Sequence, residues 1–530
     1  MNYLNLAIEN FEEEKYEIAI EYCNKLIEKE IHLETAYHIK AFSEYYLCED
    51  EDDEIIKDAL KNINLAIELN KNNVDLLYIK TCILKYMKQF ENAIVEINKA
   101  IYLSNYNYNY YYIRGCLNVS LERELEAIND FNISLDIQEN SRTYNARGEL
   151  YKKRNEHQLA RQDFQKALTL DDRDEEIWEN LGENLFELDL YELAISAFDS
   201  AIKLNPQNAY LYGRMSSVNY QLKRAEEALK CINKAIEIDP QNSYNYSKRG
   251  FVYLDYPPPK RKVTMLHDEF AMYKNSKPLN RHLLLAKKDF EKSIELDTDN
   301  TYAYWGLHDV YVTKKNYKKV LKILKKLLIL TPDDAKVYSH KGLTEMYLGY
   351  YENAITDFNK YLGFFPNSYE AYGNRGVCLT QLERYNEAML DLNKTVELYP
   401  SALTYLNRGV AKSHLDDKKG AIKDYKTALK LNPNFPTAYR NLGIAFYSQK
   451  KYKKAINMYF KAYELFKEEK NFDSAKELVY EFEDALKGLL SQKEYKSVRN
   501  ITMKMIKIGL FDDNIISLKN QAENELKISQ

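Results

Sequence analysis

Residues that could do catalytic or metal chemistry are present in this sequence, but their spacing does not group them. The eight histidines are scattered and the six cysteines stand singly. There is no glycine-rich phosphate loop, no Gly-x-Ser-x-Gly motif and no His-Glu-x-x-His motif. The sequence therefore predicts no catalytic residue, no metal site and no cofactor, although an active site assembled from distant segments is left open. Unpaired cysteines fit reduced thiols in a cytoplasmic protein.

Basic and acidic residues recur at a fixed spacing. Six times a lysine or arginine is followed 16 residues later by a glutamate or aspartate, and an insertion separates a seventh pair. The pairs are Lys80 with Glu96, Arg114 with Asp130, Arg147 with Asp163, Arg249 with Asp289, Lys341 with Asp357, Arg375 with Asp391 and Arg408 with Asp424. Where the basic residue is replaced by Leu181 or Leu307, its partner is Ala197 or Ile323. This covariation predicts structural ion pairs between facing helices, and it argues against arginines free to bind phosphate or an acidic ligand.

The pairs belong to a unit that repeats about every 34 residues. One copy of the unit has as its fixed points Trp178, Leu181, Gly182, Leu185, Tyr191, Ala194, Phe198, Ala201 and Pro206. Half of the 16 glycines and six of the 11 prolines fall at the places that Gly182 and Pro206 occupy. Small residues let two amphipathic helices approach closely, and proline ends the second helix. The pattern resembles the tetratricopeptide repeat, and we number its positions so that Trp178 is position 4.

The resemblance implies an all-α fold. We expect a right-handed superhelix, or solenoid, of about 13 helical hairpins, with a degenerate hairpin and a capping helix at the C-terminal end. Helix A is the first helix of each repeat and helix B the second. The expected organisation is 1–254 for repeats one to seven and helix A of repeat eight, 255–281 for an insert, 282–467 for the rest of repeat eight and repeats nine to 13, and 468–530 for the degenerate repeat and capping helix.

Two segments interrupt the period. Six consecutive acidic residues, Glu49–Glu54, lie between the helices of repeat two. They are interpreted as a solvated loop that favours the start of the next helix, or as a site for a cation or a basic partner. The insert 255–281 contains Pro257–Pro259 followed by Lys260–Lys262, which favours a loop along the edge of the solenoid or a polyproline segment that a partner binds.

Charge and hydropathy narrow the function classes. The formal net charge is −5 with acids and bases interspersed, which argues against a nucleic-acid-binding surface. The longest apolar run, Leu327–Leu330, is too short to span a bilayer, so no membrane association is expected. No basic residue precedes Lys15, so the sequence shows no secretory signal.

The resemblance also implies where a partner binds, because helix A lines the concave surface of such solenoids. Two groups of residues are predicted to line a peptide-binding groove. The aromatic group is Tyr210, Tyr220, Tyr244, Tyr302 and Trp305, and the amide row is Asn374, Asn407 and Asn441. Aromatic side chains on a rigid wall are typical anchors, and amides can hydrogen-bond an extended peptide backbone. Ordinary solvated surface is the alternative for both groups.

The function that these observations favour is a non-enzymatic scaffold or adaptor that binds a protein or peptide in its concave groove. The alternative is a regulatory or substrate-recruiting subunit of a separate enzyme. An RNA-binding helical repeat is a third hypothesis, which the lack of a basic groove disfavours. The sequence predicts neither the identity of the partner nor the oligomeric state.

Overall fold

The structure is a computed structural model that describes residues 3–48, 54–255 and 279–528. The acidic run up to Asp53 and the segment 256–278 of the insert lie outside the described residues. Within the described residues all regular secondary structure is helical and there is no strand. None of the helices in these ranges is both long and apolar enough to cross a membrane.

The chain divides into two compact units, Met1–Lys262 (unit 1) and Val263–Gln530 (unit 2). The helices of unit 1 are α1 (Tyr3–Glu12), α2 (Tyr16–Glu28), α3 (Leu33–Leu47), α4 (Glu54–Leu69), α5 (Val74–Tyr86), α6 (Phe90–Leu103), α7 (Tyr108–Ser120), α8 (Glu124–Ile137), α9 (Ser141–Lys153), α10 (His157–Leu170), α11 (Glu175–Glu187), α12 (Tyr191–Leu204), α13 (Ala209–Gln221), α14 (Ala225–Ile238) and α15 (Ser243–Leu254). Those of unit 2 are α17 (Leu279–Leu296), α18 (Thr301–Thr313), α19 (Tyr317–Leu330), α20 (Ala335–Tyr347), α21 (Tyr351–Phe364), α22 (Tyr369–Gln381), α23 (Tyr385–Leu398), α24 (Ala402–His414), α25 (Lys418–Leu431), α26 (Pro436–Tyr447), α27 (Tyr452–Glu468), α28 (Phe472–Ser491), α29 (Tyr495–Lys507) and α30 (Asp513–Ile528).

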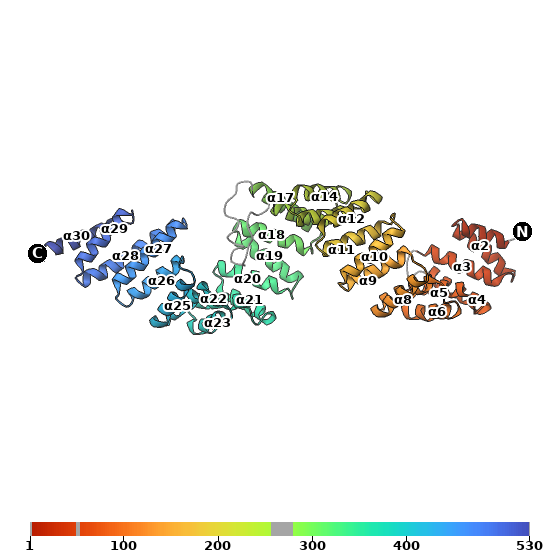
Figure 1. Cartoon of the computed structure of the whole chain (residues 1–530), viewed down its shortest axis with the longest axis horizontal. Coiled ribbons are helices and arrows are strands. Elements are labelled where there is room, and N and C mark those ends of the chain that lie inside the picture. Colours follow the sequence, from red (N-terminus) through yellow and green to blue (C-terminus); the bar gives the residue numbers. More distant parts are fainter. Residues whose placement is uncertain (1–2, 49–53, 256–278, 529–530) are drawn as a thin grey trace. The chain divides into compact units, whose positions relative to one another are not determined.

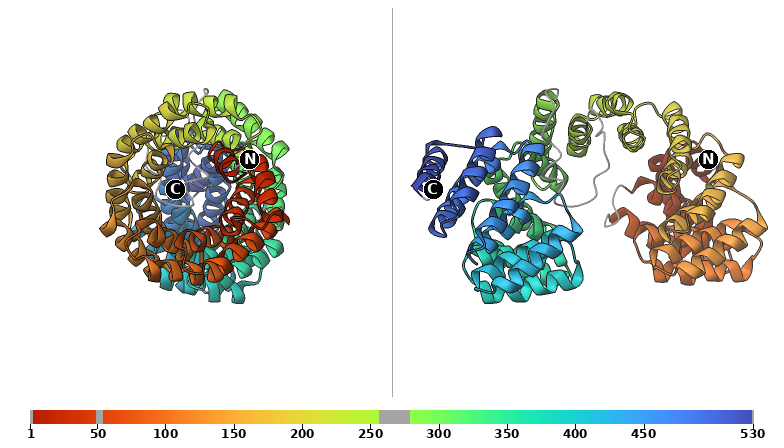
Figure 2. Two further views of the ribbon diagram at one scale, coloured as in Figure 1. Left: turned by 90° about the vertical axis from the view of Figure 1, so that its right-hand side faces the viewer. Right: turned by 60° about the vertical axis from the view of Figure 1, so that its left-hand side comes forward.

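Within each unit, consecutive helices form hairpins that stack in sequence order. Each helix A packs most extensively on its own helix B, and the next hairpin packs beside it (Figures 1 and 2). Helix A of one hairpin also contacts helix A of the next, as α22 does α24 and α24 does α26. This is the arrangement expected from the repeat pattern. It presents successive A helices side by side, which matters for the site below.

Position 8 is where the two helices of a hairpin approach most closely. Gly182 on α11 faces the ring of Phe198 on α12, and both residues are buried. A Cβ at residue 182 would lie 2.7 Å from Phe198 Cε1, closer than carbon atoms can pack. The same contact recurs in other hairpins, with Gly115 against Phe131, Gly148 against Phe164, Gly342 against Phe358, Gly409 against Tyr425 and Gly443 against Tyr459. Glycine therefore makes room for a buried ring on helix B.

The aromatic residue at position 4 fastens the loop between hairpins. Trp178 Nε1 donates a hydrogen bond of 2.9 Å to the carbonyl oxygen of Asp172, six residues earlier. The hydroxyl groups of Tyr246, Tyr304 and Tyr338 donate in the same way to the carbonyls six residues before them. These bonds satisfy loop carbonyls that no helix uses, and they hold the start of helix A against the preceding loop.

The C-terminal helices pack differently from the regular hairpins. α28 packs most extensively against α27, and α29 packs most extensively against α30, while α28 also contacts both α29 and α30. Leu478, Phe482 and Leu486 of α28 are fully buried in one apolar cluster with Tyr459 and Phe460 of α27. The long apolar face of α28 therefore covers the last regular hairpin.

We predict that Gly182→Ala destabilises the protein by about 1–3 kcal/mol, because the added methyl group displaces the Phe198 ring from a packed interior. Urea unfolding monitored by circular dichroism measures the change. Gly363→Ala on α21 is the matched control, since nothing lies within 4 Å of its added Cβ. Alanine there should stabilise the helix by up to about 1 kcal/mol. Equal effects of the two substitutions would contradict the packing argument.

Candidate functional site

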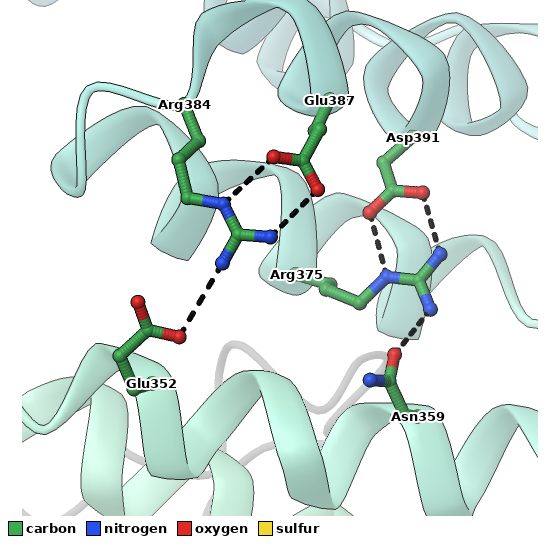
Figure 3. A network of polar contacts seen from close by, with 6 residues as sticks. All are labelled: Glu352, Asn359, Arg375, Arg384, Glu387 and Asp391. Atoms are coloured by element: carbon green, nitrogen blue, oxygen red, sulfur yellow. Dashed lines mark hydrogen bonds and ion pairs between the residues drawn. The ribbon is translucent and has the colours of Figure 1, made fainter.

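The structure brings six of the seven predicted ion pairs into contact. Arg375 on α22 binds Asp391 on α23 through two parallel hydrogen bonds, with Nε 2.7 Å and a terminal nitrogen 2.6 Å from the carboxylate oxygens (Figure 3). The other five pairs are Lys80 with Glu96, Arg114 with Asp130, Arg147 with Asp163, Lys341 with Asp357 and Arg408 with Asp424, at 2.5–3.0 Å. The residues of the seventh pair, Arg249 and Asp289, lie in different units, and that pair stays a prediction.

Each of these arginines also binds an asparagine of the preceding hairpin. The remaining terminal nitrogen of Arg375 donates to Asn359 Oδ1 at 2.5 Å, and Asn359 lies on α21 (Figure 3). The same contact joins Arg114 to Asn98, Arg147 to Asn132, Arg249 to Asn233 and Arg408 to Asn393. The guanidinium therefore links two neighbouring hairpins as well as the two helices of its own.

Sequence reasoning missed this asparagine, although the sequence contains its signal. The asparagine stands at position 25, and it precedes each of the five arginines at position 7 by 15 or 16 residues. Where position 7 is apolar, position 25 of the preceding repeat is another residue, such as Asp199 before Met215 or Lys426 before Leu442. A comparison across the repeat boundary would have found it.

A tyrosine at position 4 completes the surroundings of each arginine. The Arg375 guanidinium carbon lies 5.4 Å from the ring centre of Tyr372, and four other arginines stack on their tyrosines at 5.3–5.6 Å. Hydrogen bonding to Asp391 raises the pKa of Arg375 above its already high value. With a carboxylate, an amide and a ring around it, this guanidinium has a structural role, and the arginine row is not a ladder for anions.

We predict that Asp391→Ala destabilises the protein by roughly 3 kcal/mol, because it leaves the half-buried charge of Arg375 without its carboxylate. Glu352→Ala is the matched control in the same region, since the Arg384–Glu352 pair is exposed and 3.4 Å long (Figure 3). Exposed pairs contribute less than about 1 kcal/mol. Denaturant unfolding measures both variants, and a loss for Asp391→Ala no larger than the control would refute the structural role.

Repeat ten departs from the arginine pattern in a way that affects pH dependence. Lys341 Nζ lies 2.6 Å from Asp357 Oδ2 and 3.1 Å from Glu345 Oε1, so that two carboxylates share one ammonium group. Glu345 is buried, and its Oε2 has no hydrogen bond within the described residues. Burial, together with the hydrogen bond and the negative charge of Asp357, raises the pKa of Glu345 to about 7 from its usual 4.5. The folded protein therefore favours the neutral acid.

The sign of the resulting pH effect follows from linkage. A carboxyl with a raised pKa in the folded state costs stability as pH rises from its unfolded value through its folded value, here from about 4.5 to about 7. We predict that Glu345→Gln stabilises the protein at pH 8 by roughly 1 kcal/mol or more and changes little at pH 4. Thermal unfolding at the two pH values tests this. A stabilisation of the same size at both would contradict it.

The predicted aromatic residues are divided between the units. Tyr210, Tyr220 and Tyr244 lie in unit 1, and Tyr302 and Trp305 lie in unit 2. The structure therefore describes two groups, not one patch. Tyr210, Tyr244 and Tyr302 are 51%, 55% and 61% exposed. Tyr210 donates its hydroxyl to Glu183 at 3.0 Å, and half-buried Tyr220 donates to Asp255.

Trp305 is half-buried within a cluster of rings. It contacts His308 and His340 edge to face at centroid distances of 5.3 and 5.2 Å, and Lys336 Nζ lies 4.3 Å from its ring centre. Burial, reinforced by the nearby His308 and Lys336, lowers the pKa of His340 to about 3, so this imidazole is neutral. No group of three or more metal-ligating side chains is found among the described residues.

The amide row lies on three successive A helices of unit 2. Asn374, Asn407 and Asn441 stand at position 6 of α22, α24 and α26, and each is half-buried. None of the three side-chain amides has a hydrogen bond to another group of the described chain. Asn180 at the same position of α11 is different, because it donates to Asn145 and accepts from Lys152. The three amides of unit 2 thus keep donors and acceptors available for a partner.

An aliphatic row accompanies the amides one helical turn further on. It consists of Val377, Val410 and Ile444 at position 9, and Ile444 is 40% exposed. Among the 18 residues at positions 2, 5, 6, 9, 12 and 13 of these A helices, Glu370 and Arg440 alone carry formal charges. Arg440 is neutralised by Glu477 and Glu481. In a chain with 29% charged residues this face is depleted of charge, which is typical of the core of an interface.

Comparison with known proteins identifies the repeat. Models of the tetratricopeptide repeat match residues 145–209 and 341–402 and, with a second model, residues 185–247. A TPR repeat model matches residues 417–450. The matches fall in both units and include the helices that carry the amide row. No curated protein matches the sequence significantly.

Solved structures with detectable similarity are also repeat proteins. YrrB, described as a TPR protein with an unusual peptide-binding site, is 25% identical, with 34% of this chain and 95% of that chain covered and a TM-score of 0.31. The Cut9–Hcn1 hetero-tetramer of APC/C is 15% identical, with 92% and 96% covered and a TM-score of 0.38. The C-terminal part of a TPR repeat-containing protein from Cytophaga hutchinsonii is 18% identical, with 49% and 97% covered and a TM-score of 0.38.

Proposed function

Because the chain is a tetratricopeptide repeat protein, we propose that it is a protein-interaction scaffold and that the exposed face of α22, α24 and α26 binds an extended polypeptide segment. The observation that carries this proposal is the row of Asn374, Asn407 and Asn441. Three half-buried amides at one position of three neighbouring helices, all without partners in the described chain, match the regular donors and acceptors of an extended backbone.

The surroundings of the amide row indicate the chemistry of the bound segment. Val377, Val410 and Ile444 offer an aliphatic strip beside the amides, and Leu403 adds a side chain that is 40% exposed. Burial of aliphatic side chains against this strip would supply affinity, and amide hydrogen bonds to the backbone would fix register. A charged residue of the segment would lose water there without gaining an opposite charge. The segment is therefore uncharged and rich in aliphatic residues.

The aromatic residues are further proposed anchors for the same partner. Tyr244 and Tyr302 are more than half exposed and are the best suited of the five. Tyr210, Tyr220 and Trp305 are already engaged by Glu183, Asp255 and Lys336 respectively, so they would have to exchange these contacts to bind. The tyrosines therefore rank below the amide row as binding residues.

Selection of random peptides displayed on phage against the immobilised full-length chain tests the proposal. We expect the selected peptides to be uncharged and to carry aliphatic residues. Substitution of Asn374, Asn407 and Asn441 by alanine should weaken their binding by about 10-fold to 100-fold, since each lost hydrogen bond contributes about 0.5–1.5 kcal/mol. Fluorescence anisotropy with the best peptide measures the affinity.

Asn386→Ala is the matched control, because Asn386 is an exposed asparagine on α23, the helix B of the same hairpin as Asn374. It should leave the affinity unchanged. Selected peptides that are mostly acidic or basic, or that bind the triple variant as well as the wild type, would reject this face as the binding site.

A further inference from the structure

The two units carry charges of opposite sign. Unit 1 has 46 acidic and 32 basic residues, a formal net charge of −14, whereas unit 2 has 34 acidic and 43 basic residues, a net charge of +9. The expectation of interspersed charges thus describes the chain as a whole and is wrong for its units. The densest positive segment of unit 2 is Lys314–Lys326, which contains seven lysines and no acidic residue.

Most of this segment lies on α19, and three of its lysines form one exposed stripe, here called the lysine face (Figure 1). Lys318, Lys322 and Lys325 are spaced by four and three residues, so they share one side of the helix. All three are exposed, and none is in an ion pair within the part of the chain that the structure describes. The closest carboxylate to the segment is Asp299, whose Oδ1 lies 4.0 Å from Lys326 Nζ.

The lysine face is unfavourable for α19 itself. Like charges three and four residues apart repel one another on a helix. Lys318 and Lys319 also stand in the first turn, where the helix dipole favours an acidic residue, and α21 and α23 have Glu352 and Glu387 at that place. The fold of unit 2 therefore does not account for these lysines.

Comparable lysines on other B helices of unit 2 are neutralised locally. Lys292 pairs with Glu295 at 2.9 Å, and Lys394 pairs with Glu397 at 3.0 Å. Both pairs use the same two positions of the repeat. In α19 these positions hold Lys326 and an exposed isoleucine, so the pair is absent there.

We propose that the lysine face of α19 binds the acidic run Glu49–Glu54 of a second copy of this chain. The run holds six consecutive carboxylates, and all of it except Glu54 lies outside the described residues. Contact between the two segments relieves repulsion within each of them, which is the basis of charge complementarity. The lysine face contains neither arginine nor an aromatic ring, so it is poorly suited to bases or to bidentate phosphate binding.

Sedimentation velocity of the full-length chain at about 20 mM and about 500 mM salt tests the proposal, because such a contact is screened by salt. We expect the wild type to self-associate at the lower salt concentration and to be monomeric at the higher one. Lys318→Glu, Lys322→Glu and Lys325→Glu together should raise the dissociation constant at least about tenfold. Replacing Asp50, Asp52 and Asp53 by asparagine should have the same effect.

The matched control is a second triple reversal, Lys419→Glu, Lys423→Glu and Lys426→Glu, on exposed positions of α25. It changes the net charge equally and should leave association intact. An equal mixture of the α19 variant and the acidic-run variant should form a one-to-one complex, since each retains the segment that the other lacks. A wild type that is monomeric at low salt, an equal loss in the α25 variant, or no complex in the mixture would overturn the proposal.

Discussion

The close approach of the two helices in each hairpin is the constraint on which the rest of this structure depends. At position 8 there is no room for a methyl group, because a ring from helix B fills the space, as Phe198 does against Gly182. This contact sets the separation of the helices. That separation in turn brings position 7 within hydrogen-bonding distance of position 23, where Arg375 meets Asp391. Packing and ion pairing are therefore two results of one geometry.

Much of the fold could be predicted from the sequence, because 13 imperfect copies of one unit can be compared with each other. The glycines, the prolines and the covariation of positions 7 and 23 indicated helical hairpins and their internal ion pairs. The link from Arg375 to Asn359 was missed because the comparison stopped at the boundary of each repeat. Residues in contact across neighbouring units lie outside a pattern that is read within one unit.

The candidate site was less predictable, since availability depends on neighbours that a pattern does not name. Asn180 and Asn407 occupy the same position, yet Asn145 and Lys152 saturate the first, and the second has no partner in the described chain. Trp305 has an aromatic residue's usual promise as an anchor, but it is covered in part by Lys336. In each case the deciding side chain comes from the adjacent hairpin.

The arginine link has a consequence for recognition. Asn374 and Asn407 directly precede Arg375 and Arg408 in the chain, and these arginines tie α22 and α24 to the hairpins before them. The spacing between the amides is therefore fixed before any partner arrives. A ruler of this kind is preorganised, so little conformational entropy is lost in ordering the protein when a segment docks. Stiffness built into the joints between hairpins would then appear as affinity at their surface.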